Sequence, residues 1–303
     1  LILSIFRILL IRVYKLFGIN RFVIRKVFDY KMYLDIYDQG LSKQLIKYRK
    51  RELDHKYILE KTLKKGSTVL DIGANIGYYA LMELNLIGDN GRLIAVEPSP
   101  SNVDLLKKNI ALNGKNNNTR IISGAISSVT GKEKFYLSYA SNLNTFHNYG
   151  TVTQHLSGET IDVSTYKVID VLNKDEMERG LDLIRMDVEG HEVDVLNGLI
   201  DEIESGKLLP AIVFETHISR YTKENDMSKT LKKLFSLGYK VKYMASSWEK
   251  GTVMINEYGY SETVSIKTDG VTRAIFENID DEDAIDTICK VGGARTVYIE
   301  HFS

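Results

Sequence analysis

A short loop that begins with a carboxylate and contains two glycines is the first feature that indicates a ligand. Residues 71–77 read DIGANIG and follow an apolar run that we expect to be a strand. Gly73 would let the backbone turn tightly beside a ligand, and Gly77 would let the next helix start against the sheet. A dinucleotide site brings a pyrophosphate to such a loop, where Asp71 would oppose it, and the third glycine of that pattern is absent. The carboxylate suits a ligand with an ammonium group, as S-adenosylmethionine has.

A second acid supports a nucleoside at the same place. Glu97 ends the next expected strand, twenty-four residues after Gly73. An acid at this position can accept hydrogen bonds from both hydroxyls of a ribose. It would serve NAD equally well, so Glu97 indicates a nucleoside without deciding the cofactor.

Four more polar residues follow two later strands. Asp187 and Glu189 lie two residues apart at the end of one strand, and Glu215 and His217 stand in the same relation at the end of the next. Strand geometry would send both members of each pair to one side. Three carboxylates so close would repel one another, so we expect some to be paired, protonated or bound to a metal.

Two chemical interpretations of this cluster stay open. In the first, one group is a general base, and His217 suits this role because its ordinary pKa lies near working pH. In the second, Asp187 and Glu215 hold a divalent cation such as magnesium, which acidifies a hydroxyl. We favour the metal-free version, because the sequence does not establish enough ligands. Glu192 is more simply explained as a helix-capping acid.

Three sequence blocks resemble the FkbM-type methyltransferases. They are VLDIGANIGYY at 69–79, VEPSP at 96–100 and IRMDVEGHE at 184–192, and the resemblance covers roughly residues 66–240. It implies methyl transfer from S-adenosylmethionine, mostly O-methylation of sugars, glycans or natural products. The residues that we expect at the cofactor are Asp71, Gly73, Ala74, Asn75, Gly77, Tyr78, Glu97, Pro98 and Ala125.

Alternating strands and helices would position these residues. Strands are expected at 67–72, 92–96, 120–125, 183–187, 211–216, 239–244 and 294–301, and helices at 76–87, 101–112, 191–204 and 226–237. This alternation predicts a Rossmann-like, doubly wound α/β fold with a mostly parallel sheet of seven strands. The methyltransferase domain would span 66–303, behind an N-terminal helical extension over 1–65.

The alternation weakens between residues 126 and 182. Short strands are expected at 134–137 and 161–163, separated by a polar stretch over 138–158. Long polar excursions inside α/β domains are usually functional loops. The side chains there that could bind a sugar-like molecule are Tyr139, Asn142, Asn144, His147 and Tyr149.

The extension is basic and partly amphipathic. Residues 1–65 hold 16 Lys and Arg but 6 Asp and Glu, although the whole chain has no net charge. Residues 1–17 are mostly apolar and predict an amphipathic helix that lies on a membrane or packs on protein. We expect a cytoplasmic protein that is peripheral to the inner face of the membrane if residues 1–28 bind lipid. Cys289 is the single cysteine, which excludes a disulfide framework.

Two other functions compete. The basic extension could hold RNA for methylation of a ribose 2′-hydroxyl, although a nucleic-acid partner is the less favoured reading. Methylation of cytosine C5 needs a cysteine nucleophile, for which Cys289 is badly placed. A non-catalytic, cofactor-binding protein recruited to membranes is the second rival. The sequence indicates neither the acceptor nor the oligomeric state.

Overall fold

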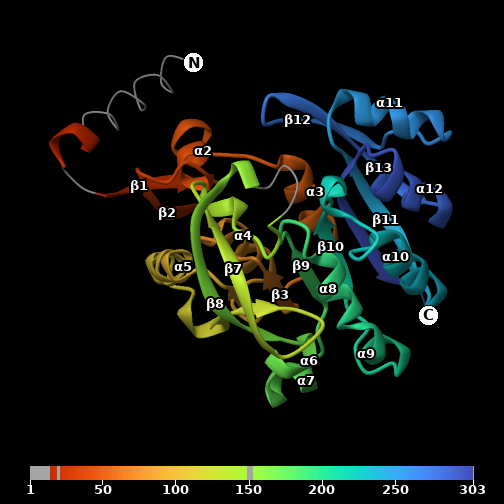
Figure 1. Cartoon of the computed structure of the whole chain (residues 1–303), viewed down its shortest axis with the longest axis horizontal. Coiled ribbons are helices and arrows are strands. Elements are labelled where there is room, and N and C mark those ends of the chain that lie inside the picture. Colours follow the sequence, from red (N-terminus) through yellow and green to blue (C-terminus); the bar gives the residue numbers. More distant parts are fainter. Residues whose placement is uncertain (1–13, 19–20, 149–152, 303) are drawn as a thin grey trace.

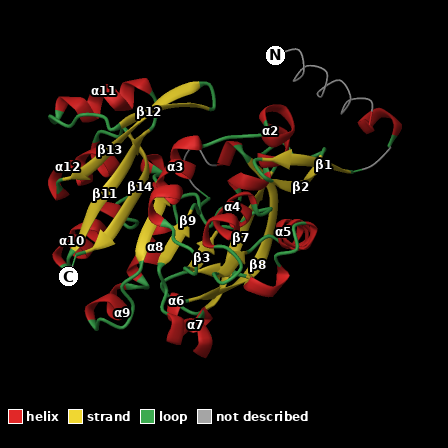
Figure 2. Cartoon of the chain, turned by 180° about the vertical axis from the view of Figure 1, so that it is seen from behind, coloured by secondary structure: helices red, strands yellow, loops and turns green. Residues whose placement is uncertain are grey.

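The centre of the molecule is a nine-stranded sheet with helices on both faces (Figures 1 and 2). The computed structural model describes residues 14–18, 21–148 and 153–302. From edge to edge the strands are β12 (Val264–Thr268), β13 (Val271–Ile279), β11 (Tyr239–Ser246), β14 (Ala294–His301), β10 (Ala211–Glu215), β9 (Leu183–Met186), β3 (Thr68–Ile72), β4 (Arg92–Glu97) and β5 (Thr119–Ser123). Strands β5, β4, β3, β9 and β10 run parallel, and β14 is antiparallel to both of its neighbours.

This topology confirms the predicted Rossmann-like fold, with one difference at an edge. All seven expected strands are present, but β12 and β13 extend the sheet beyond β11 to nine strands. The first four residues of β12 alternate between partly buried and exposed, and the last, Thr268, is buried. Such an edge strand gives a weaker apolar signal than the buried parallel strands of the centre.

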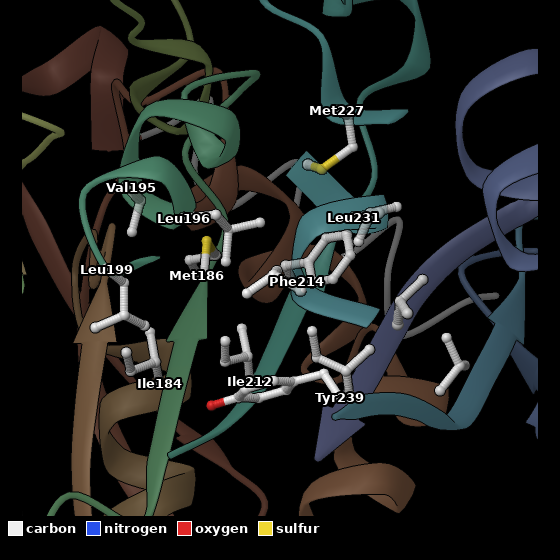
Figure 3. Close-up of a cluster of buried hydrophobic side chains, with 14 of the residues drawn as sticks. Ile184, Met186, Val195, Leu196, Leu199, Ile212, Phe214, Met227, Leu231 and Tyr239 are labelled. Atoms are coloured by element: carbon white, nitrogen blue, oxygen red, sulfur yellow. The ribbon is translucent and has the colours of Figure 1, made fainter. Parts of the chain in front are cut away.

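Successive residues of each central strand enter two different hydrophobic cores, as the period of two requires. Val69, Leu183 and Val213 belong to one core, under α3 (Leu53–Thr62), α4 (Tyr78–Ile87) and α5 (Pro100–Leu112). Leu70, Ile184 and Ile212 belong to the other core. Figure 3 shows part of this second core, including Ile184 and Ile212. That core lies under α6 (Val168–Val171), α8 (Glu192–Asn197), α9 (Ile200–Glu204), α10 (Met227–Ser236), α11 (Glu249–Glu257), α12 (Asp281–Ile285) and the π-helix Asp286–Lys290. The helix expected at 191–204 is thus two helices, α8 and α9.

A small second sheet interrupts the alternation where the sequence pattern weakens. Its strands are β6 (Ala125–Ile126), β8 (Leu156–Tyr166) and β7 (Gly131–Ser138), in that order, followed in the chain by α6 and α7 (Lys174–Arg179). Strands β7 and β8 form a hairpin that is longer than the two short strands predicted here. The connection between them includes the 3-10 helix Ser141–Leu143 and reaches over the carboxyl ends of the central strands (Figure 1).

The N-terminal extension is not helical throughout, so that prediction is wrong for residues 22–35. These residues form the antiparallel hairpin β1 (Phe22–Val27) and β2 (Tyr30–Asp35), followed by helices α2 (Leu41–Tyr48) and α3. Tyr30, Met32 and Leu34 are buried and Lys31 is exposed, which is the period of a strand.

The hairpin packs against the main domain. The backbone N–H of Tyr33 donates to Oδ1 of Asn109 on α5 at 2.6 Å, and the buried residues of β2 share a core with α4 and α5. Of the helix expected at 1–17, residues 14–17 are helical and residues 1–13 lie outside the described part. No helix among the described residues has the length and apolar character needed to cross a membrane.

Candidate active site

The predicted loop connects β3 to α4 in a backbone conformation that requires glycine. Gly73 has φ 79°, and a Cβ there would lie 2.4 Å from the carbonyl oxygen of Asp187. Gly77 has φ 93°, and a Cβ there would meet Leu106 of α5 at 2.8 Å. The N–H groups of Gly73 and Ala74 both donate to the carbonyl of Val96, at 2.9 and 3.0 Å. The loop is therefore held against the ends of β4 and β9.

Glu97 lies buried at the end of β4, beside the same loop. Its carboxylate accepts hydrogen bonds from the backbone N–H of Asn75 at 2.9 Å, that of Ser99 at 2.9 Å and the Asn102 side chain at 3.2 Å. Burial raises the pKa of Glu97 to about 7, against the effect of these donors. Oε2 of Glu97 has one of these donors and can accept another.

A first cavity opens above the carboxyl ends of β3 and β4, with about 500 Å³ of empty space that includes open solvent. Five of the predicted cofactor residues line it: Gly73, Asn75, Glu97, Pro98 and Ala125. The other lining residues are Ile72, Val96, Gly124, Ile126, Phe135, Ser141, Asn142, Asn144, Phe146, Asp187, Val188, Glu189 and His191. Apolar residues that stand beside convergent polar groups, as they do here, are typical of small-molecule sites.

A second cavity, with about 430 Å³ of empty space, lies beside the first. Gly73, Asn75, Asn142 and Asp187 line both cavities. The remaining lining residues of the second are Leu41, Arg51, Glu52, Ala74, Tyr78, Tyr79 and Arg185, so the predicted cofactor residues Ala74 and Tyr78 lie here. Arg51 and Glu52 were not among the predicted site residues, because they lie outside the motifs at 69–79, 96–100 and 184–192.

Asp71 has a protein partner in place of a ligand. It is completely buried, and Nη1 of Arg185 donates to its Oδ1 at 3.1 Å. Burial raises the pKa of Asp71, and Arg185 opposes that shift. Within the described chain, Asp71 and Gly77 line neither cavity. A ligand in either cavity therefore does not reach Asp71, and the predicted contact between Asp71 and an ammonium group has no open route in this structure. An arginine inside the apolar strand β9 was the signal that could have indicated this ion pair.

Asp187, Glu189 and His217 come together at the ends of β9 and β10, with one possible ligand atom of each within 4.8 Å of the others. Nε2 of His217 lies 3.7 Å from Oδ1 of Asp187 and 3.7 Å from Oε2 of Glu189. The group could hold one cation, but it differs from the predicted pair of Asp187 and Glu215. Among the described residues, Glu215 is not part of it, and Arg295 pairs with Glu215 at 2.7 Å.

His217 is not placed as a base with an ordinary pKa. Its Nδ1 lies 3.0 Å from Oε1 of Glu192, which is completely buried. Burial lowers the pKa of His217, but the charges of Glu192, Glu189 and Glu215 outweigh it and raise the pKa to about 10. His217 is then an imidazolium at neutral pH. Glu192, predicted to cap a helix, accepts from the Val188 N–H at 3.0 Å as well as facing His217.

Each acid of the cluster also has an arginine beside it. Nη2 of Arg185 lies 3.4 Å from Oδ2 of Asp187, and Nη2 of Arg220 lies 2.6 Å from Oε2 of Glu189. Burial raises the pKa of Glu189 to about 7 although His217 lowers it, and burial raises that of Glu215 to about 8 although Arg295 lowers it. The expected repulsion between carboxylates is therefore relieved by partial protonation of Glu189 and Glu215 near neutral pH together with the neighbouring cations.

The polar loop residues are divided among several places. Asn142 and Asn144 line the first cavity, whereas Tyr139 is largely exposed and lines a groove beside β1. His147 lines a separate surface cavity. Tyr149 lies outside the described residues. Asn75 Nδ2 donates to the carbonyl of Ser141 at 3.2 Å, so the loop before Asn142 contacts the glycine loop.

Two proteins named as methyltransferases are similar to this chain in sequence. A protein named Methyltransferase sdnD from Sordaria araneosa is 28% identical over 195 residues, which are 56% of this chain and 73% of that protein. A protein-L-isoaspartate O-methyltransferase from Methanococcoides burtonii is 39% identical over 57 residues, 19% of this chain and 28% of that protein.

Among solved structures, TYW2 of M. jannaschii in complex with AdoMet matches with 17% identity and a TM-score of 0.41, covering 86% of this chain and 88% of that one. Methyltransferase FkbM from Methylobacillus flagellatus KT matches with 12% identity and a TM-score of 0.41, covering 78% and 53%. The family model of the methyltransferase FkbM domain matches residues 71–241, more than half of the sequence. The chain therefore belongs to the FkbM family of S-adenosylmethionine-dependent methyltransferases.

Proposed function

We propose that the protein transfers the methyl group of S-adenosylmethionine to a hydroxyl of a sugar, glycan or related small molecule. The observation that carries this proposal is the position of Asp187. Its side chain keeps 28% of its surface exposed and lines both cavities. A carboxylate between a donor site and an acceptor site can receive the proton of the attacking hydroxyl.

The first cavity fits S-adenosylmethionine by the chemistry of its walls. Val96, Ile126 and Phe135 offer apolar surface for a purine ring. Glu97 can accept hydrogen bonds from ribose hydroxyls. Gly73 has no side chain that would fill the space between the glycine loop and Asp187 at the end of β9. The contact predicted between Asp71 and the ammonium group is replaced in the proposal by Glu189, which lines the first cavity.

When bound, S-adenosylmethionine supplies an electrophilic methyl group: the acceptor oxygen forms the C–O bond, the C–S bond breaks with its electrons staying on sulfur, and the hydroxyl proton must leave. Asp187 takes that proton. Arg185 at 3.4 Å and His217 at 3.7 Å hold its carboxylate between them. Glu189, paired with Arg220, is assigned to the ammonium group, and Glu215, paired with Arg295, acts as a positioning residue. Alignment of donor and acceptor supplies most of the rate in such a transfer.

The proposal includes a peripheral membrane contact through the N-terminal segment. Leu16 and Phe17 are 80% and 68% exposed, and Lys15 stands beside them. Apolar side chains next to a cation suit an anionic lipid surface. Leu16→Ser with Phe17→Ser should then release the protein from anionic vesicles in a sedimentation assay, and Val253→Ser, an exposed apolar residue on α11, should not. Equal sedimentation of both variants would remove this part of the proposal.

The proposed activity is tested by following a labelled methyl group from S-adenosylmethionine into carbohydrate, lipid and RNA acceptors in parallel. We expect incorporation into a carbohydrate hydroxyl. Incorporation into RNA that falls steeply with salt would favour the ribose alternative. Binding of the cofactor without transfer to any of the three would favour a non-catalytic role.

A further inference from the structure

We propose that the second cavity is the acceptor site, that it takes an uncharged acceptor rich in hydroxyls, and that Arg51 and Asn142 bind this acceptor. This inference rests on the proposed function and names where and how that function recognises its substrate. Arg51 belongs to the segment before α3, and Asn142 belongs to the loop between β7 and β8.

The two cavities are placed as a donor site and an acceptor site must be. Methyl transfer needs the attacking oxygen in line with the C–S bond and within about 3–3.5 Å of the methyl carbon. Gly73, Asn75, Asn142 and Asp187 line both cavities, so the two meet there. A ligand in the second cavity therefore reaches the donor at the position of Asp187.

The charges that line the second cavity cancel. Arg51 pairs with Glu52, and Arg185 lies against Asp187 at 3.4 Å. Behind them, Arg185 also pairs with Asp71, and Arg295 lies 2.9 Å from Glu52. A charged acceptor would have to displace one of these ions from its partner, whereas an uncharged one leaves the pairs intact. The lining therefore favours a neutral acceptor.

Unused hydrogen-bonding atoms indicate what the neutral acceptor carries. Nε of Arg51, Nε of Arg185 and Oδ1 of Asn142 are buried without a protein partner, and all three side chains line the cavity. The Arg185 side chain is 98% buried, with 2% of its surface exposed. The first two atoms are donors and the third is an acceptor. A hydroxyl both donates and accepts, so neighbouring hydroxyls of a polyol would satisfy these atoms together.

The tyrosines of the cavity already have partners. Tyr78 Oη donates to the carbonyl of Arg51 at 2.6 Å, and Tyr79 Oη donates to Glu52 at 2.7 Å. The Arg185 guanidinium stacks over the Tyr79 ring at 3.9 Å. These contacts hold Arg51 and Glu52 in position and leave the orphan atoms named above for the ligand.

One side of the second cavity, the acceptor wall, is formed by Leu41, Arg51 and Glu52, which lie outside the residues 71–241 that the family model matches. The N–H of Glu52 donates to Asp269 at 3.0 Å, and the N–H of Leu53 donates to Thr268 at 3.1 Å. The turn between β12 and β13 thus fixes the segment that carries Arg51. Strands β12 and β13, which extend the sheet beyond the seven predicted strands, therefore support the acceptor wall.

The test measures labelled-methyl transfer to methyl glycosides of neutral hexoses and 6-deoxyhexoses, with glycosides of uronic acids and amino sugars as charged counterparts. Arg51→Met removes the guanidinium and keeps the chain length, and Arg49→Met, exposed two residues earlier, is the matched control. Arg51→Met should raise the KM for the neutral glycoside about tenfold or more. It should change kcat and the affinity for S-adenosylhomocysteine less than about twofold.

An Arg51→Met variant that matches Arg49→Met overturns the acceptor-site inference and leaves the proposed function standing. A wild-type preference for uronic acid or amino sugar glycosides overturns the neutral class. Transfer to no glycoside at all overturns the proposed function itself, and the polyol class with it. If Arg51→Met lowers the melting temperature, Asn142→Ala provides the same test from a different element.

Discussion

Nδ1 of His217 lies 3.0 Å from Oε1 of Glu192, and the charge of Glu192, with those of Glu189 and Glu215, outweighs burial and makes His217 a cation at neutral pH. The relationship changes the role of His217 from a proton acceptor to a residue that holds Asp187 and Glu189. It also gives a role to Glu192, the buried carboxylate at the start of α8, three residues after Glu189.

The charge on His217 should make stability depend on pH. Its pKa in the folded protein is raised to about 10, above the usual 6.5, so its stabilisation is full below about pH 6.5 and is lost as pH rises through about 10. Urea unfolding of wild type and His217→Gln should show a stability difference that shrinks from pH 6.5 to pH 10. Glu192→Gln should reduce the same dependence. A difference that stays constant over this range would contradict the charged state of His217.

The buried pair of Asp71 and Arg185 should be structural. Asp71→Asn leaves the Arg185 guanidinium, buried to 98%, with less compensation, and breaking such a pair typically costs about 3–5 kcal/mol of unfolding free energy. Asp89→Asn removes the acid of the exposed pair with Lys115 and should change stability little. Chemical denaturation measures both. Equal stability of the two variants would mean that Arg185 finds another partner.

Cofactor affinity should rise with pH because of Glu97. Burial raises its pKa to about 7, and the ionised carboxylate is the form whose Oε2 accepts a hydrogen bond from a ribose hydroxyl. Calorimetry should show tighter binding of S-adenosylhomocysteine as pH increases from 6 to 8. Glu97→Gln should weaken binding about tenfold or more and flatten this trend. The ligand titrates equally in both experiments, so an identical slope would exclude Glu97 as the cause.

Chelator should leave the methyl-transfer rate unchanged. Asp187, Glu189 and His217 could hold an ion by distance, but Arg185 and Arg220 already neutralise the two acids. A kinetic assay with and without a strong chelator, followed by added magnesium, measures the dependence. Loss of activity that magnesium restores would replace the metal-free chemistry with a metal-assisted one, while the family assignment would stand.

Local patterns predicted the parts of the molecule that depend on neighbours in sequence. The glycine loop, the position of Glu97 and the strand ends that carry Asp187 and Glu215 follow from short motifs and from the alternation of strands and helices. The hairpin at 22–35 was missed because two short amphipathic strands beside helices give a weak signal. The packing of Tyr33 on Asn109 stabilises it from a distance.

The acceptor wall could not be predicted, since its contacts are long-range. Glu52 meets Asp269 and Arg295, more than two hundred residues later in the chain. The partner of Asp71 was hidden for the same reason, because Arg185 lies 114 residues later in the chain. A motif shows which acids are present but not which cations neutralise them. Arg185 and Arg220 change the electrostatics of the site and belong to none of the sets predicted for it.

The most direct test of the central claim is the methyl-transfer rate of Asp187→Asn. Asp187 is proposed to accept the proton of the hydroxyl between the two cavities, and loss of a positioned base typically lowers the rate about 10²–10⁴-fold. The comparison is with Asp201→Asn, which changes an exposed acid on α9. Affinity for S-adenosylhomocysteine, measured in parallel, should stay within a few fold in both variants. We predict a kcat at least about a hundredfold lower for Asp187→Asn and unchanged for Asp201→Asn. A kcat for Asp187→Asn within a few fold of wild type, with the cofactor bound normally, would contradict the account.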